Sequence, residues 1–125
     1  MRGERQSLSN WRGAVTTRGE KGEQALVRRA MAAPADDDPR ALTHGFHVYP
    51  ARLHPHLART LVTTVAPGAV VLDPFCGSGT VLVEAVAHGC RAVGRDINPL
   101  AIRIARLKTA VWSPDRSAAA RAVRW

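Results

Sequence analysis

The chain has 125 residues, of which 46% are hydrophobic and 22% are charged, so it can bury the core of one domain at most. Lysine and arginine outnumber the acidic residues by 18 to 10, which gives a formal net charge of +8. No apolar run approaches the roughly 20 residues that a membrane-spanning helix requires, so no membrane partner is expected. The first residues lack the apolar segment of a signal peptide, and neither of the two cysteines has a pairing pattern. We therefore expect a cytoplasmic protein with reduced thiols.

The first 40 residues are expected to form a flexible N-terminal arm, because glycine, serine, asparagine and charged residues dominate and no strand pattern occurs. Within this arm, Gln24 to Ala33 could form a short helix that ends at Pro34. We divide the remainder into a compact part, residues 41–112, and a tail, residues 113–125.

The middle of the chain predicts a helix, a strand, a tight loop and a second helix. A helix is expected from about His56 to Thr64, followed by a turn at Ala66-Pro-Gly68. The apolar run Ala69 to Leu72 has the length and composition of a buried strand. It ends at Asp73, and a loop with Gly77 and Gly79 on either side of Ser78 follows. A helix from Thr80 to Ala87 then ends at His88-Gly89, where glycine is the usual C-terminal cap. Such a corner suits a ligand, because glycines allow close backbone approach and a helix N-terminus presents unpaired N–H groups.

A second strand, roughly Ala92 to Arg95, leads to Asp96, which lies 23 positions after Asp73. In a strand–helix–strand unit this spacing places an acid at the carboxyl end of the neighbouring strand, where it can accept hydrogen bonds from two ribose hydroxyls. Asp96 could instead, or in addition, cap the next helix, and Asn98-Pro99 could equally start it. That helix is expected from about Pro99 to Val111, with one apolar face made of Leu100, Ile104, Leu107 and Val111.

Three segments resemble a known family. The string Asp73-Pro-Phe-Cys-Gly-Ser-Gly-Thr80 resembles motif I of the S-adenosylmethionine-dependent amino-methyltransferases, and Gly94-Arg-Asp-Ile-Asn-Pro99 is similar to their motif II. The stretch from His44 to Leu57 looks like motif X, and Arg52 lies where the family tends to carry a basic residue. The resemblance covers roughly residues 44–108. It implies an α/β fold, namely a partial Rossmann-like class I methyltransferase fold with its first two parallel strands and their flanking helices.

The same resemblance implies S-adenosyl-L-methionine as cofactor. It places Gly77 to Gly79 near the methionine portion, gives Asp73 the role of organising the loop, puts Asp96 on the ribose and lays Ile97 against the adenine ring. The implied cofactor-binding residues are Asp73, Pro74, Phe75, Cys76, Gly77, Ser78, Gly79, Thr80, Asp96, Ile97 and Asn98.

The implied activity is methylation of an exocyclic amine of a nucleic-acid base. The lead Tyr49-Pro-Ala-Arg52 resembles the DNA enzymes more, as in DNA methylation by restriction-modification systems, so DNA is favoured over RNA as partner. A tRNA or rRNA guanine-N2 methyltransferase is the alternative. Residues 91–125 hold eight basic and two acidic residues, which suits a polyanion or, equally, a solvated arginine-rich face. A P-loop is excluded because no Gly-Lys-Ser/Thr follows the loop, and a nicotinamide enzyme is disfavoured because a third glycine is missing.

No catalytic motif is found. The family carries an Asp/Asn/Ser-Pro-Pro-aromatic motif whose aromatic residue stacks on a base flipped out of the duplex. Trp112-Ser-Pro-Asp115 has one proline and no following aromatic residue, so it does not qualify, and the catalytic residues stay unknown. We therefore expect a fragment, a truncated product or half of a split enzyme, with the C-terminal side missing. A non-catalytic subunit that completes its site with a second chain is a further hypothesis.

Two other chemistries are disfavoured. A metal site at His44, His47, His54 and His56 lacks cysteine or carboxylate ligands at suitable spacing, so capping or solvent-facing roles are favoured, with His54-Pro55 opening a helix. A nucleophilic role for Cys76 is disfavoured, because this residue follows Phe75 inside the cofactor motif rather than a proline in a separate loop.

Overall fold

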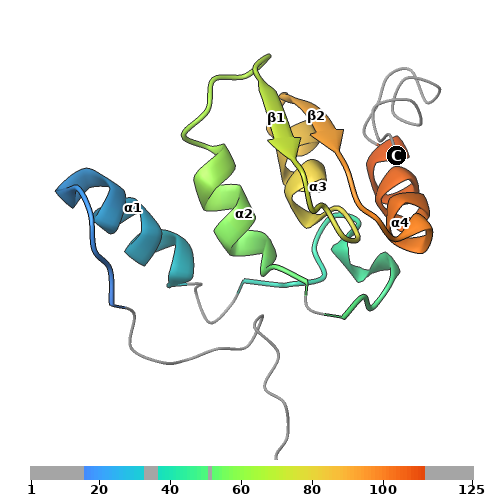
Figure 1. Ribbon diagram of the computed structural model, residues 1–125, viewed down its shortest axis with the longest axis horizontal. Coiled ribbons are helices and arrows are strands. Elements are labelled where there is room, and N and C mark those ends of the chain that lie inside the picture. Colours follow the sequence, from blue (N-terminus) through green and yellow to red (C-terminus); the bar gives the residue numbers. More distant parts are fainter. Residues whose placement is uncertain (1–15, 33–36, 51, 112–125) are drawn as a thin grey trace, which may run out of the picture.

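The computed structural model describes residues 16–32, 37–50 and 52–111 (Figure 1). The elements in chain order are α1 (Lys21–Met31), the short 3-10 helix η2 (His44–Phe46), α2 (Pro55–Val62), β1 (Val70–Asp73), α3 (Thr80–Ala87), β2 (Arg91–Gly94) and α4 (Pro99–Ala110). The first 15 residues of the expected arm, the expected tail and the string Trp112-Ser-Pro-Asp115 lie outside the described residues.

The two strands form a parallel pair joined by α3. Val70 pairs with Arg91 and Asp73 pairs with Gly94, so the carboxyl ends of both strands meet at the same edge. Each strand is within one residue of its predicted position. The predicted fold class, two parallel strands with flanking helices, is confirmed.

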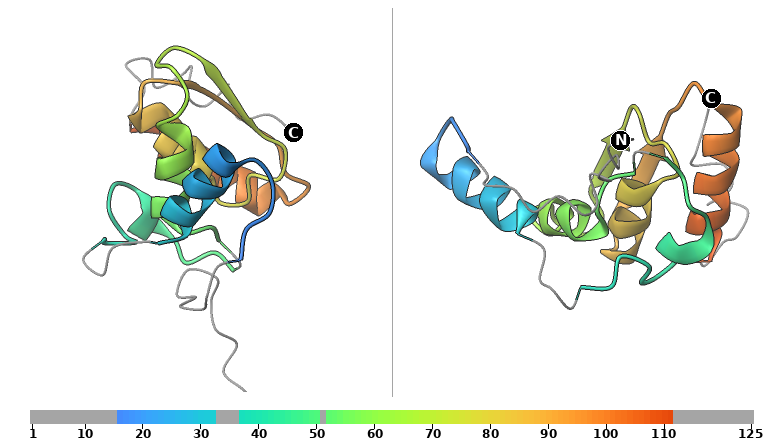
Figure 2. Two further views of the ribbon diagram at one scale, coloured as in Figure 1. Left: turned by 90° about the vertical axis from the view of Figure 1, so that its left-hand side faces the viewer. Right: turned by 90° about the horizontal axis from the view of Figure 1, so that it is seen from below.

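The helices lie in a row beside the sheet. Helix α1 packs on α2, α2 on α3 and α3 on α4, and α3 also contacts both strands (Figures 1 and 2). The shared core lies between α2, α3, the strands and α4 and comprises Val62, Cys76, Leu82, Ala85, Cys90, Ala92, Ile102 and Ala105. The opposite face of β1 is open among the described residues, and Val70 and Leu72 are 56% and 61% exposed.

The helix termini follow from local sequence. His54 caps α2, because its Nδ1 accepts a hydrogen bond from the backbone N–H of His56 at 3.2 Å, as the predicted start of this helix required. At the end of α3, the N–H of Gly89 donates to Val86 and the N–H of Cys90 donates to Ala85. This double closure needs a left-handed residue, and Gly89 has φ +80°.

Helix α1 begins three residues earlier than predicted and ends at Met31. It packs against α2, and Ala30 is 3% exposed, so this part of the expected arm is folded onto the rest of the chain. The division at residue 40 itself stays a prediction.

The predicted apolar face of α4 is wrong. Leu100, Leu107 and Val111 are 55%, 59% and 64% exposed, and of the four predicted residues only Ile104 is buried. The buried face consists of Ala101, Ile102, Ile104, Ala105, Lys108 and Thr109. The reason is steric. Ala105 packs so closely against Gly79 that a Cβ added at Gly79 would lie 2.8 Å from Cβ of Ala105, and this close contact favours small residues on the inward face.

The prediction for His44 is also wrong, because this residue neither caps a helix nor faces solvent. It is 1% exposed, and its Nε2 lies 2.9 Å from Oε1 of the buried Glu84. Arg59 donates two further hydrogen bonds to Glu84, at 3.1 Å each, and a third to Asp37 at 2.9 Å. Burial alone would raise the pKa of Glu84, but the hydrogen bonds from His44 and Arg59 outweigh it and lower the pKa. These hydrogen bonds connect η2 and α2 to α3.

Within the described part of the chain, no group of three or more histidine, cysteine or acidic residues could hold a metal ion. No helix among the described residues is long and apolar enough to cross a membrane.

Candidate ligand-binding site

The loop after β1 is a tight turn held by its own hydrogen bonds. The carboxylate of Asp73 accepts from the N–H of Phe75 at 3.1 Å, and the N–H of Gly79 donates to the carbonyl of Cys76 at 2.7 Å. Gly77 and Gly79 have φ of +49° and +83°, which side chains disfavour. Helix α3 then begins directly at Thr80.

Asp96 ties this loop to the end of β2. Its Oδ2 accepts from the N–H of Gly77 and its Oδ1 from the N–H of Asn98, both at 2.8 Å. Of the two residues that could cap α4, Asn98 is the N-cap, because its Oδ1 accepts from the N–H of Leu100 at 2.9 Å. The amide of Asn98 also donates to the hydroxyl of Tyr49 at 3.0 Å, which joins the segment before α2 to the site.

The glycines of the site differ in how much space a side chain at each position would find. A Cβ on Gly79 would lie 2.8 Å from Cβ of Ala105, so this glycine is needed for α4 to pack. A Cβ on Gly94 would lie 2.5 Å from Leu82. A Cβ on Gly77 would meet only the ring of Tyr49, at 3.7 Å, so the backbone there is open to a ligand.

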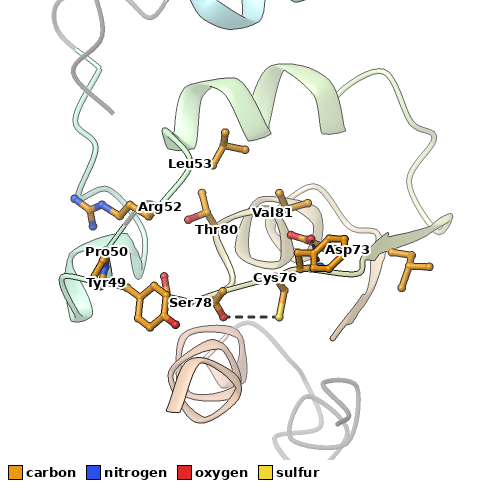
Figure 3. Close-up of a pocket in the computed structure, with 12 residues that line it drawn as sticks. Tyr49, Pro50, Arg52, Leu53, Asp73, Cys76, Ser78, Thr80 and Val81 are labelled. Atoms are coloured by element: carbon orange, nitrogen blue, oxygen red, sulfur yellow. Dashed lines mark hydrogen bonds between the residues drawn. The ribbon is translucent and has the colours of Figure 1, made fainter. Parts of the chain in front are cut away.

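A pocket of about 400 Å³ lies beside the loop (Figure 3). Its walls come from the segment before α2, the end of β1, the loop and the first turn of α3. The lining residues are Tyr49, Pro50, Arg52, Leu53, Leu72, Asp73, Phe75, Cys76, Gly77, Ser78, Thr80 and Val81. In the view of Figure 3, Arg52 and Tyr49 lie at one end and Asp73 at the other, with Ser78 between them.

Two buried titratable groups adjoin this pocket. Burial raises the pKa of the Cys76 thiol to about 11, and the carboxylates of Asp73 and Asp96 act in the same direction. A thiol with this pKa is a poor nucleophile at neutral pH. Burial, assisted by the charge of Arg52, lowers the pKa of Lys108 to about 8, and its Nζ lies 3.4 Å from Oγ of Ser78.

Comparison with known proteins agrees with this geometry. A family model described as "RMKL-like, methyltransferase domain" matches residues 43–116, more than half of the chain. The chain belongs to this methyltransferase family. The resemblance inferred from the three motifs is thereby confirmed, and the family implies a methyl donor of the S-adenosylmethionine type.

Among the relatives of this methyltransferase domain is the type II methyltransferase M.MvaI of Kocuria varians. It is 44% identical over 81 residues, which cover 62% of this chain and 18% of the relative. A tRNA (guanine(10)-N2)-dimethyltransferase of Methanothermobacter thermautotrophicus is 48% identical over 52 residues, 40% of this chain and 16% of the relative. The type II methyltransferase M.MjaII of Methanocaldococcus jannaschii is 36% identical over 66 residues, 52% of this chain and 12% of the relative. The chain thus spans less than a fifth of each of these proteins.

The pocket is lined by six of the eleven residues predicted for the site, namely Asp73, Phe75, Cys76, Gly77, Ser78 and Thr80. The other five, which do not line it, are Pro74, Gly79, Asp96, Ile97 and Asn98. Asp96 and Asn98 are nevertheless hydrogen-bonded to two residues that line the pocket, Asp96 to Gly77 and Asn98 to Tyr49. Ile97 projects into solvent and is 99% exposed.

The sequence analysis did not identify Lys108 as a residue near the site. Position 108 follows Ala105 by three residues and Ile104 by four, so it shares their face once that face is known to be buried.

Proposed function

We propose that this domain binds S-adenosylmethionine and serves the methylation of an exocyclic amine of a nucleic-acid base, with DNA as the favoured substrate. One observation carries the proposal. Two carboxylates, Asp73 and Asp96, lie at the carboxyl ends of adjacent parallel strands. Asp96 accepts a hydrogen bond from Gly77, in the glycine loop that lines the pocket. The crevice outside the carboxyl ends of parallel strands is where open α/β sheets bind ligands.

The residues present fit such a methyl donor. The backbone at Gly77 is open, and the pocket of about 400 Å³ falls within the range of small-molecule sites. The carboxylate of Asp96 accepts two backbone N–H groups, yet a carboxylate offers about four acceptor positions, so ribose hydroxyls can still bond to it. The exposed apolar side chain of Ile97, next in sequence, suits an adenine ring.

We propose the eleven residues predicted from sequence as the cofactor-binding set, within a cofactor-binding part comprising residues 41–112. The methyl donor, when bound, supplies an electrophilic methyl group. The chain's contribution is to hold and orient it, since alignment of the reacting atoms supplies much of the rate of such a transfer. The group that holds the target amine is proposed to come from a second chain or a further segment.

The alternative is a tRNA guanine-N2 substrate, which two relatives suggest by their names. DNA is favoured because the match to a type II methyltransferase extends over 81 residues, against 52 for the tRNA enzyme quoted above. Fluorescence anisotropy titrations with duplex DNA and with tRNA at equal salt decide between them. Tighter binding of tRNA would reverse the assignment, and salt must be fixed because basic surfaces bind any polyanion.

Cofactor binding is tested by calorimetric titration of the full chain with S-adenosylmethionine. We expect saturable binding by the wild type and at least tenfold weaker binding by Asp96→Ala, because hydrogen bonds to a charged group contribute about 1.5–3 kcal/mol each. Asp38→Ala is the matched control, since Asp38 is an exposed carboxylate that accepts a hydrogen bond from the N–H of Arg40. A folded wild type that binds no cofactor, or equal losses in both variants, would overturn the proposal.

A further inference from the structure

Lys108 is a lysine buried beneath the ligand loop. Its side chain is 1% exposed, and its backbone carbonyl accepts a hydrogen bond from the hydroxyl of Thr43 at 3.0 Å. Among the described residues no carboxylate pairs with it, and the one hydrogen bond of its ammonium goes to Ser78, at 3.4 Å. Burial of an unpaired ammonium is costly, and methionine would fill the same space without a charge. Packing alone therefore does not explain a lysine at this position.

The hydrogen bond to Ser78 has a direction. An ammonium carries donors only, so Oγ of Ser78 accepts from Lys108 and its own hydrogen points elsewhere. Ser78 is 2% exposed and lines the pocket, so its hydroxyl is available as a donor to a group bound there.

Arg52 places a positive charge in the pocket wall itself, in addition to the buried charge of Lys108. Its Nη1 donates to the carbonyl of His44 at 3.1 Å, which fixes the guanidinium without neutralising it. The carboxylate of Asp73 lies at the other end of the pocket in Figure 3 and already accepts from Phe75. The end near Arg52 and Ser78 therefore presents one cation and a hydroxyl donor, and the ammonium of Lys108 lies behind that hydroxyl.

We propose that Lys108, acting through Ser78 and together with Arg52, makes this end of the pocket a carboxylate subsite that selects ligands carrying an amino-acid carboxylate. The inference rests on the proposed function, in which the methionine portion of the methyl donor supplies that group. Lys108 is a positioning residue, because it polarises and orients Ser78 rather than lining the pocket. A nucleic-acid phosphate is disfavoured as the anion, since Lys108 and Ser78 are only 1% and 2% exposed, which suits the small end of a ligand better than a polymer backbone. Charge-assisted hydrogen bonds away from water are the stronger kind, which gives the subsite its selectivity.

The test compares the dissociation constants of S-adenosylmethionine and of its decarboxylated analogue by calorimetry on the full chain. We expect the wild type to prefer the carboxylate-bearing ligand at least tenfold. Lys108→Met should reduce this preference to less than threefold while leaving the affinity for the decarboxylated analogue unchanged. Ser78→Ala should act in the same direction. Lys21→Met is the control, because Lys21 is the only other lysine of the chain and lies exposed in α1.

The ratio of the two constants separates this role from a purely structural one, which would weaken both ligands alike. Equal losses for both ligands, or an unchanged preference in Lys108→Met and Ser78→Ala, would overturn the subsite and leave the proposed function standing. A wild type that binds neither ligand would overturn the proposed function and the subsite with it.

Discussion

The buried ammonium of Lys108 should lower the stability of the ligand-free protein. Burial, assisted by Arg52, lowers its pKa from 10.5 to about 8. One pKa step corresponds to about 1.4 kcal/mol, so keeping the charged form in the fold costs about 3 kcal/mol at neutral pH. Methionine has a similar length and no charge. Lys108→Met is therefore expected to raise the free energy of unfolding at pH 7 by about 1–3 kcal/mol, where the lower value allows for the lost hydrogen bond to Ser78.

The stability gained by Lys108→Met should decrease as the pH rises. In the folded protein Lys108 releases its proton near pH 8, whereas in the unfolded chain it keeps the proton until about pH 10.5. Between these values the unfolded state binds more protons, so the stability contribution of this group rises with pH. The difference in stability between Lys108→Met and the wild type is thus largest below pH 8 and narrows toward pH 10.5.

Urea unfolding followed by far-ultraviolet circular dichroism at pH 7 and pH 9.5 measures both quantities. Lys21→Met, at an exposed position, should stay within about 0.5 kcal/mol of the wild type at both values. A Lys108→Met protein that is less stable than the wild type at pH 7, or a stability difference that does not narrow at pH 9.5, would show that Lys108 is not an uncompensated buried cation.

Two further outcomes are expected. Gly79→Ala should destabilise the fold by about 2–4 kcal/mol in urea unfolding, because its Cβ would lie 2.8 Å from Ala105 and the position has φ +83°. Alkylation of Cys76 by iodoacetamide at pH 8, followed by peptide mass spectrometry, should be about a hundredfold slower in the folded than in the unfolded chain. The reason is that burial first, and then Asp73 and Asp96, raise its pKa from 9.0 to about 11, which reduces the thiolate fraction.

Each of these two predictions has an outcome that would contradict it, and Gly79→Ala also has a control variant. Gly22 lies in α1 with nothing within 4 Å of an added Cβ, so Gly22→Ala should be neutral or stabilising by up to about 1 kcal/mol. A Gly79→Ala protein as stable as Gly22→Ala would mean that α4 is free to move away from the loop. Fast alkylation of Cys76 in the folded chain would contradict its burial and reopen the question of its reactivity.

The fold around the loop could be predicted because local signals there agree. An apolar run of strand length, glycines in the loop and a glycine at the end of α3 all indicate the same strand–loop–helix unit, and the boundaries fall within one residue of prediction. Asn98 as N-cap was one of two alternatives that the sequence left open. Only the hydrogen bonds of the folded chain decide between them, because Asp96 and Asn98 are both good capping residues.

The buried face of α4 could not be predicted from apolar spacing, because two faces of this helix satisfy it. Leu100, Ile104 and Leu107 repeat at helical spacing, and so do Ala101, Ala105 and Lys108. Hydrophobicity favours the leucines, but the close contact of Ala105 with the loop at Gly79 favours the face with the small residues. This tertiary requirement also carries Lys108 into the interior, against the strong tendency of lysine to stay exposed.

Glu84 and Lys108, the two most buried charges of the described residues, differ in the partners that surround them, and this difference indicates what each one does. The carboxylate of Glu84 meets His44 and Arg59, so its burial is compensated within the fold. The ammonium of Lys108 meets one hydroxyl. A charge that only joins helices needs partners from those helices, as Glu84 has. A charge left without an anion, behind a hydroxyl that lines a pocket, lowers stability until an anion arrives, and binding of that anion then recovers part of the loss. The stability cost of Lys108 and its proposed selectivity for a carboxylate therefore have the same origin, the buried positive charge that no anion of the described residues compensates.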